Sequence, residues 1–328
     1  MPEPVASPDA EAAPPRSRNR SLRRVAEVVV TVAFLGFVCW AVAHRWSEVR
    51  DVIGELSVPA LALSALAAIG AVWCGFLSWR ALLVDFGRTV PATGAMRIFF
   101  VGQLGKYLPG KVWPILTQAR LGRAYGVPGR TSAAAVLVTM LIALGTGVLV
   151  TVCALPVLGD RTFDTYWWVL LVLPIAAVSL WPPVLNAILA RLMRVARREP
   201  LPRPLSLRGI AWAVLWSVVS WLLFGVHLWA LLADLGGAGV DLLPRAIGAF
   251  AGAWVIGFVL AITPAGVGPR EVALLVLLGS TVTPSAALVA ALVSRLLMTV
   301  ADLIWPAVTL IGHRRRSTVP SVADTAVR

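Results

Sequence analysis

Four charged residues lie in or beside apolar runs near the end of the chain: Arg270, Glu271, Arg295 and Asp302. A charged side chain at the centre of a bilayer costs about 2.5–3.5 kcal/mol on the insertion scale, so such residues pair with one another or face water. Arg295 and Asp302 are separated by about two helical turns, roughly 10 Å, which is too far for direct contact. Each therefore needs a partner elsewhere, and Glu271 is the candidate for Arg295.

Proline and glycine interrupt two otherwise apolar stretches, 95–118 and 246–280. The interruptions read Tyr107-Leu-Pro-Gly-Lys-Val-Trp113 and Thr263-Pro-Ala-Gly-Val-Gly-Pro-Arg-Glu271. Backbone groups freed by such breaks cannot face hydrocarbon, so they are buried in protein or line a wet cavity. One broken segment in each half of a transporter is a sequence sign of its binding site. The positive N-terminal end of the helix that restarts after each break suits a phosphate or a carboxylate.

Two purely structural interpretations compete with a binding site. Kinks at proline and glycine are common in membrane helices, and a buried ion pair can serve only to fix helix packing. His227, which lies alone inside an apolar run, is expected to be hydrogen-bonded to a neighbouring helix rather than to bind a metal.

The composition identifies the class of protein that must position these residues. Of the 328 residues, 59% are hydrophobic and 14% are charged, whereas soluble proteins have about 45–50% and 25%. Apolar runs of roughly 20 residues are long enough to span a bilayer as helices. We expect an all-α, polytopic membrane helix bundle of about 7–8 apolar segments, with two re-entrant, Gly/Pro-broken segments in pseudo-repeated halves. The net charge of +13 sits between apolar runs, which argues against nucleic-acid binding.

The chain divides into three parts. Residues 1–24 are expected to be a disordered basic cytoplasmic arm, residues 25–311 the membrane domain and residues 312–328 a disordered cytoplasmic tail. The apolar runs of the membrane domain are 25–43, 60–84, 131–156, 165–189, 209–232, 243–262 and 285–311.

If the last span is to finish in the cytoplasm, the stretch 246–280 must start and end on the external side of the membrane. Either 246–262 crosses fully and a short helix at 271–280 crosses back, or the whole stretch is a re-entrant pair that turns at 264–269. A ten-residue helix rises only about 15 Å, half of the hydrocarbon core. This favours the re-entrant pair, although 246–262 is nearly long enough to span.

No enzyme motif is present. The chain lacks Gly-x-Ser-x-Gly, Walker A and His-Glu-x-x-His sequences. Its three cysteines have neither metal-site nor disulfide spacing, so no cofactor and no metal are expected. Glu271 with Tyr107 is the only candidate acid–base pair, and it is a weak one.

The two broken segments resemble the signatures of the lysylphosphatidylglycerol synthase transmembrane-region family, also called flippase-like or UPF0104 proteins. The first signature is carried by Tyr107, Pro109, Gly110, Lys111 and Trp113, followed by Arg120 and Gly126. The second is carried by Pro264, Gly266, Gly268, Arg270, Glu271, Arg295 and Asp302. Many members have a Glu-Arg pair in the span after the first signature, where this chain has Thr139-Met140.

The resemblance implies a membrane unit that moves a phospholipid between leaflets, without the soluble aminoacyl-transfer domain of the bifunctional members. We therefore expect a lipid translocase that is not driven by ATP and acts on an anionic phospholipid, glycolipid or polyprenyl-phosphate lipid. The alternative is an accessory subunit of a membrane glycosyltransferase or lipid synthase, and a homo-oligomer is a further expectation. The expected substrate-binding residues are those of the two signatures other than Gly126, together with Lys106.

Arginine and lysine predict the orientation in the plasma membrane. Seven basic residues lie in 85–130 and six in 190–208, whereas the loops 44–59, 157–164 and 233–245 together hold four. Cytoplasmic loops carry such an excess, so both termini are predicted to be cytoplasmic and residues 233–242 external.

Reporter fusions at Arg316 and Gly237 test this topology, because the first should report the cytoplasm and the second the outside. An external signal from the Arg316 fusion would refute the topology.

Overall fold

The protein is a helical membrane bundle. The computed structural model describes residues 54, 56–107, 112–158, 174, 178, 180–195, 197–260, 268–279 and 282–317. All regular elements in these ranges are helices. Five helices there are long and apolar enough to cross a membrane: Val58–Asp85, Gly129–Leu158, Leu207–Asp234, Leu242–Leu260 and Ser285–Thr309. The expected all-α membrane bundle is therefore confirmed.

Two helices of equal length pack along each other in the bundle. Helix α3 (Val58–Asp85) and helix α10 (Leu207–Asp234) have 28 residues each. A serine begins each helix, because its hydroxyl accepts a hydrogen bond from a backbone N–H of the first turn. An aspartate ends each one. Serine and aspartate thus occupy matching positions in both helices.

The ends of α3 and α10 bind each other reciprocally. Asp85 accepts hydrogen bonds from the backbone N and the hydroxyl of Ser206, at 2.7 and 2.6 Å. Asp234 accepts the same two bonds from Ser57, at 2.5 and 2.9 Å. Because the end of each helix meets the start of the other, α3 and α10 are antiparallel.

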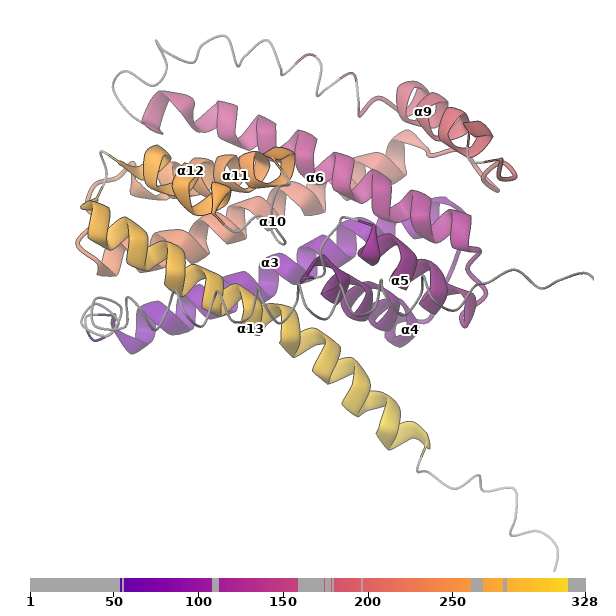
Figure 1. The fold of residues 1–328 in the computed structure, drawn as a ribbon, viewed down its shortest axis with the longest axis horizontal. Helices are drawn as coiled ribbons and strands as arrows, with labels where there is room; N and C mark the ends of the chain where they lie inside the picture. Colours follow the sequence, from indigo (N-terminus) through magenta and orange to yellow (C-terminus); the bar gives the residue numbers. More distant parts are fainter. Residues whose placement is uncertain are drawn as a thin grey trace, which may run out of the picture.

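The helices after α3 and those after α10 follow a similar order, with shorter elements first and a long helix last. After α3 come the short helix α4 (Ala92–Met96), helix α5 (Trp113–Arg123) and the long helix α6 (Gly129–Leu158). After α10 come α11 (Leu242–Leu260), the short α12 (Pro269–Leu278) and the long α13 (Pro284–Ser317). We call residues 92–107 and 113–123 together the first hairpin, and residues 242–260 and 269–278 together the second hairpin. The two hairpins lie toward opposite ends of the bundle (Figure 1), as the antiparallel α3 and α10 require.

The first hairpin departs from α-helical geometry just before the predicted break at 107–113, of which residues 108–111 lie outside the described residues. After α4 the chain forms a π-helix at Arg97–Val101 and a 3₁₀-helix at Leu104–Tyr107. Such segments are frequent at functional sites and connectors. Helix α5 then packs back on them.

Glycines allow the two limbs of the first hairpin to touch. A Cβ atom at Gly102 would lie 2.2 Å from Cγ of Gln118, and one at Gly105 would lie 2.8 Å from the backbone N of Pro114. Neither distance is available to a real Cβ, so only glycine permits this approach.

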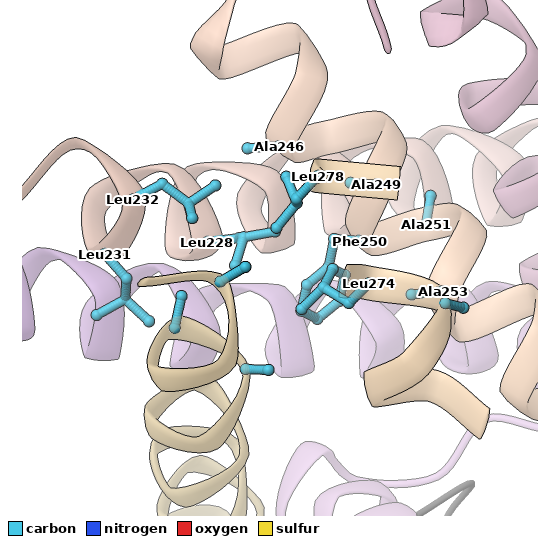
Figure 2. Packing of buried hydrophobic residues seen from close by; sticks show 14 of the residues in the cluster. Leu228, Leu231, Leu232, Ala246, Ala249, Phe250, Ala251, Ala253, Leu274 and Leu278 are labelled. Atoms are coloured by element: carbon cyan, nitrogen blue, oxygen red, sulfur yellow. The ribbon is translucent and has the colours of Figure 1, made fainter. Parts of the chain in front are cut away.

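The second hairpin packs in its own apolar cluster. Figure 2 shows Leu228 and Leu231 of α10, Phe250 of α11 and Leu274 of α12 in this cluster. A separate cluster surrounds the first hairpin and includes Phe99 and Phe100 of its π-helix. Each hairpin is thus held by apolar contacts of its own.

Part of the expected span count differs from the structure. The run 165–189 is not one continuous helix in its described part, because Leu180 and Trp181 are not helical and helix α9 (Pro182–Val195) begins after them. Two consecutive prolines suit the first turn of a new helix, where an N–H is not needed. The run 25–43, the arm and the end of the tail lie outside the described residues. Helix α13 continues to Ser317, beyond the expected end at 311.

Helix α11 is longer than the re-entrant interpretation requires. Its 19 residues rise about 28 Å, close to the hydrocarbon thickness of about 30 Å. Length alone therefore permits α11 to cross. The ten-residue α12 is too short to cross, so the argument for a re-entrant second hairpin stays a prediction.

Helices α10 and α11 approach closely at Gly225, which yields a stability test. A Cβ at Gly225 would lie 2.0 Å from Cγ1 and 2.7 Å from Cα of Ile247. We expect Gly225→Ala to separate the helices and to lower the free energy of unfolding by about 1–3 kcal/mol. The variant should therefore have a lower thermal unfolding temperature in detergent.

Gly75→Ala is the matched control. A Cβ at Gly75 in α3 would meet no atom within 4 Å, and alanine favours a helix over glycine by about 1 kcal/mol. Unfolding of Gly75→Ala should occur at or above the wild-type temperature. Equal unfolding temperatures for the two variants would contradict the close packing at Gly225.

Candidate functional site

The first hairpin contacts a buried carboxylate on α13. Asp302 has a side chain only 7% exposed. Its Oδ2 accepts a hydrogen bond from the Tyr107 hydroxyl at 2.7 Å and forms an ion pair with Lys106 Nζ at 2.6 Å. Both partners belong to the 3₁₀-helix that precedes the predicted break. The sequence left the partner of Asp302 open; in the structure it is Lys106, whose amine the 3₁₀-helix brings to α13.

Aromatic rings hold the first hairpin against α13. The ring of Phe100 stacks on Trp305 with centroids 5.3 Å apart, and Trp305 lies 4.5 Å from Trp73 of α3. The Trp305 indole N–H also donates to the Ile69 carbonyl at 3.3 Å. These contacts lie one turn beyond Asp302 and help to fix the position of its partners.

The second hairpin forms an ion pair with the same helix. Glu271 Oε1 lies 3.0 Å from Arg295 Nε, as the sequence predicts. Its other oxygen, Oε2, accepts a hydrogen bond from the backbone N of Gly268 at 2.6 Å. Gly268 has a φ of +93°, which L-residues rarely adopt. Glu271 therefore holds both Arg295 and the start of α12.

Arg270 has a different environment from the other charged residues. Its guanidinium lies 4.5 Å from the ring centroid of Phe250, and Nη2 lies 3.2 Å from Met298 Sδ. Among the described residues, no carboxylate lies within ion-pair distance of Arg270. A ring face and a sulfur atom stabilise a cation only partly.

One face of α13 connects the two hairpins. Arg295 binds the second hairpin and Asp302 binds the first, about 10 Å apart along the helix. Thr299 lies between them; its hydroxyl donates to the Arg295 carbonyl at 2.9 Å and also interacts with Tyr107. The side chain of Arg270 interacts electrostatically with Arg295, Glu271, Asp302 and Tyr107. These contacts define one polar cluster inside the bundle.

The cluster has an excess of positive charge. Its described members contribute three cations and two carboxylates: Lys106, Arg270, Arg295, Glu271 and Asp302. The two ion pairs balance four of these charges and leave that of Arg270. In a low-dielectric interior an unbalanced cation is costly, so an anion that reached Arg270 would be bound favourably.

A small pocket opens beside this cation. It is lined by Arg270, Glu271, Leu274, Ala291, Ser294 and Arg295. The pocket has room for roughly one water molecule. The pocket in this conformation marks where an anionic oxygen can reach, and a whole lipid headgroup needs more space.

His227 joins three helices beside the cluster, and the prediction that it is hydrogen-bonded is confirmed. The side chain is fully buried. Nδ1 lies 2.8 Å from the Ser64 hydroxyl and 3.0 Å from the Ser64 carbonyl, on α3. Nε2 lies 2.8 Å from the hydroxyl of Ser294, on α13. Within the described ranges, no three His, Cys, Asp or Glu residues gather as metal ligands would.

The remaining predicted site residues are placed as follows. Trp113 begins α5 and packs on Gly105, whereas Arg120 is exposed two turns further along α5. Pro109, Gly110, Lys111, Pro264 and Gly266 lie outside the described residues. Thr139, which stands where many relatives are expected to be charged, donates to the Ala135 carbonyl of its own helix.

Sequence reasoning missed five uncharged members of the site: Ser64, Phe250, Ser294, Met298 and Thr299. Their residue types are common in membrane helices, so residue type alone does not mark them. Only the spacing of Thr299 between Arg295 and Asp302, on one helical face, gave a usable signal.

A family model described as Lysylphosphatidylglycerol synthase TM region matches residues 24–305 of the chain. No curated protein matches it.

The pairing of Asp302 with Lys106 can be tested by a double-mutant cycle. We expect Asp302→Asn and Lys106→Met each to destabilise the purified protein by about 1.5–3 kcal/mol, because each leaves a charged group without its partner. The double variant should lose less stability than the sum of the two. Thermal unfolding in detergent measures all three.

Glu199→Gln provides the control for this cycle. It breaks the Arg130–Glu199 pair, in which the glutamate side chain is 77% exposed, and exposed pairs contribute about 0–1 kcal/mol. Strictly additive effects of Asp302→Asn and Lys106→Met would mean that the two side chains do not interact.

Proposed function

The chain belongs to the lysylphosphatidylglycerol synthase transmembrane-region family, and we propose that it is a lipid translocase that carries an anionic lipid across the membrane without ATP. The family model covers residues 24–305, so membership concerns nearly all of the membrane domain. In this proposal the lipid is moved and not chemically changed.

The observation that carries the proposal is the excess cation at Arg270. The other two cations of the cluster have carboxylate partners, whereas Arg270 contacts a ring and a sulfur atom. An anion at this position would balance the cluster. Guanidinium forms two parallel hydrogen bonds to phosphate, which favours a phosphate ester over a neutral headgroup.

The expected substrates share this chemistry. Phosphatidylglycerol and its derivatives and polyprenyl-phosphate sugars carry a phosphate close to the apolar chains, and an anionic glycolipid presents an acidic oxygen group of its headgroup instead. The Arg270 guanidinium would take the phosphate, while Arg295 stays on Glu271 and Lys106 stays on Asp302. Glu271 and Asp302 are thus positioning residues in the proposal, and Lys106, Arg270 and Arg295 supply the positive field.

The arrangement of the hairpins supports transport over static binding. The two hairpins start from opposite ends of the antiparallel α3 and α10 and both contact α13. Inverted repeats with interrupted helices are typical of transporters in which one fixed site opens to either side. Because the pocket has room for roughly one water molecule, lipid entry requires one hairpin to move away from α13.

A flipping assay in proteoliposomes tests the proposal. Wild-type protein should move a fluorescent-headgroup phosphatidylglycerol between leaflets without ATP. Arg270→Gln should slow this at least about tenfold, because a hydrogen bond between charged groups contributes about 1.5–3 kcal/mol. Arg191→Gln, which removes an exposed arginine on α9, should leave the rate unchanged.

Two outcomes would overturn this function. Wild-type vesicles that flip none of the three anionic lipid classes would favour the accessory-subunit alternative, in which the chain serves a membrane glycosyltransferase or lipid synthase. Normal flipping by well-folded Arg270→Gln would remove the headgroup role of Arg270. Unfolding temperatures of the variants show whether each is folded.

A further inference from the structure

A buried histidine stands beside the proposed anion site without a part in the function proposed above. We propose that His227 is a proton-binding site coupled to the anion site, so that the anionic lipid is bound together with a proton. The inference rests on the proposed translocase function and names how its transport is coupled to the proton gradient.

The hydrogen bonds of His227 determine which nitrogen carries hydrogen. The Ser64 carbonyl can only accept, and it lies 3.0 Å from Nδ1, so Nδ1 carries the hydrogen in neutral His227. The Ser64 hydroxyl donates to the His227 carbonyl at 3.0 Å and can accept from Nδ1. Nε2 is therefore an acceptor, and the Ser294 hydroxyl donates to it at 2.8 Å.

Protonation reverses the last of these bonds. A proton taken up at Nε2 makes that nitrogen a donor, so the Ser294 oxygen becomes the acceptor and its hydrogen must turn elsewhere. Ser294 lines the pocket with Arg270 and Arg295. The hydroxyl thus presents a lone pair to the pocket when His227 is neutral and a hydrogen when His227 is charged. Only the second state donates to an anionic oxygen.

Electrostatics couples the two sites in the same direction. Both side chains contact the ring of Phe250: the Arg270 guanidinium lies 4.5 Å from its centroid and the His227 ring 5.9 Å from it. The Arg270 charge opposes a second positive charge on His227. An anion bound at Arg270 removes that opposition, so it strengthens proton binding at His227. By linkage, a proton on His227 strengthens anion binding by the same factor.

Among the described residues, the groups in direct contact with the His227 ring are uncharged. Helix α3 brings Ser64, α11 brings Phe250 and α13 brings Ser294. The charged groups that face this region are Arg270 and Glu271 on α12 and Arg295 on α13. Both oxygens of Glu271 are already occupied.

The first measurement is proton uptake on lipid binding. Purified wild-type protein in detergent is titrated calorimetrically with dihexanoyl-phosphatidylglycerol near neutral pH, in buffers of different ionisation enthalpy. We expect uptake of a fraction of a proton, roughly one at most, per bound lipid. Binding of this lipid without proton uptake overturns the inference and leaves the translocase proposal intact. If the wild type neither binds nor flips the lipid, the translocase proposal fails, and this inference fails with it.

The second measurement uses His227→Gln. A glutamine amide can donate to Ser64 and accept from Ser294, but it cannot take up a proton. In proteoliposomes with an imposed pH gradient, the wild-type flipping rate should follow the gradient, at least about threefold across two pH units. The His227→Gln rate should not follow it, and Ser294→Ala should weaken the dependence. Unaltered gradient dependence in His227→Gln overturns the inference.

Discussion

The cost of placing charge in a low-dielectric interior governs how this protein is assembled. Asp302 is nearly inaccessible, and only groups that reach α13 can balance it. The first hairpin supplies them by leaving α-helical geometry, which turns Lys106 and Tyr107 toward the carboxylate. The charge of Arg295 also needs a partner, and the second hairpin supplies the carboxylate of Glu271. The two hairpins thus both contact one face of one helix.

The sequence predicted the parts that depend on local pattern and on scarce residue types. Apolar runs predicted the long helices, and the pair of Arg295 with Glu271 was predictable because few carboxylates lie in apolar surroundings. The partner of Asp302 was not predictable, since Lys106 is 196 residues away along the chain and no pattern selects it over other cations. The interruption at Leu180 and Trp181 was missed because hydropathy does not report helix ends.

The reciprocal contacts of α3 and α10 were missed for a different reason. A serine before a helix is normally understood as a cap for that helix alone, and Ser57 and Ser206 do serve in this way. Their second role, as donors to Asp234 and Asp85, depends on an antiparallel neighbour of equal length. The available signal was the matching placement of the two residue types, because each half of the chain has a serine before a 28-residue helix and an aspartate at its end.

The equal length of these two helices has a consequence for the surrounding lipid. Twenty-eight residues rise about 42 Å, more than the hydrocarbon core of about 30 Å and close to the full bilayer of about 40–45 Å. Since each helix is fastened to the other at both ends, neither can slide or tilt alone when membrane thickness changes. The two helices must therefore respond to hydrophobic mismatch by tilting together. A thinner or thicker bilayer would change the orientation of the pair, and with it the orientation of both hairpins.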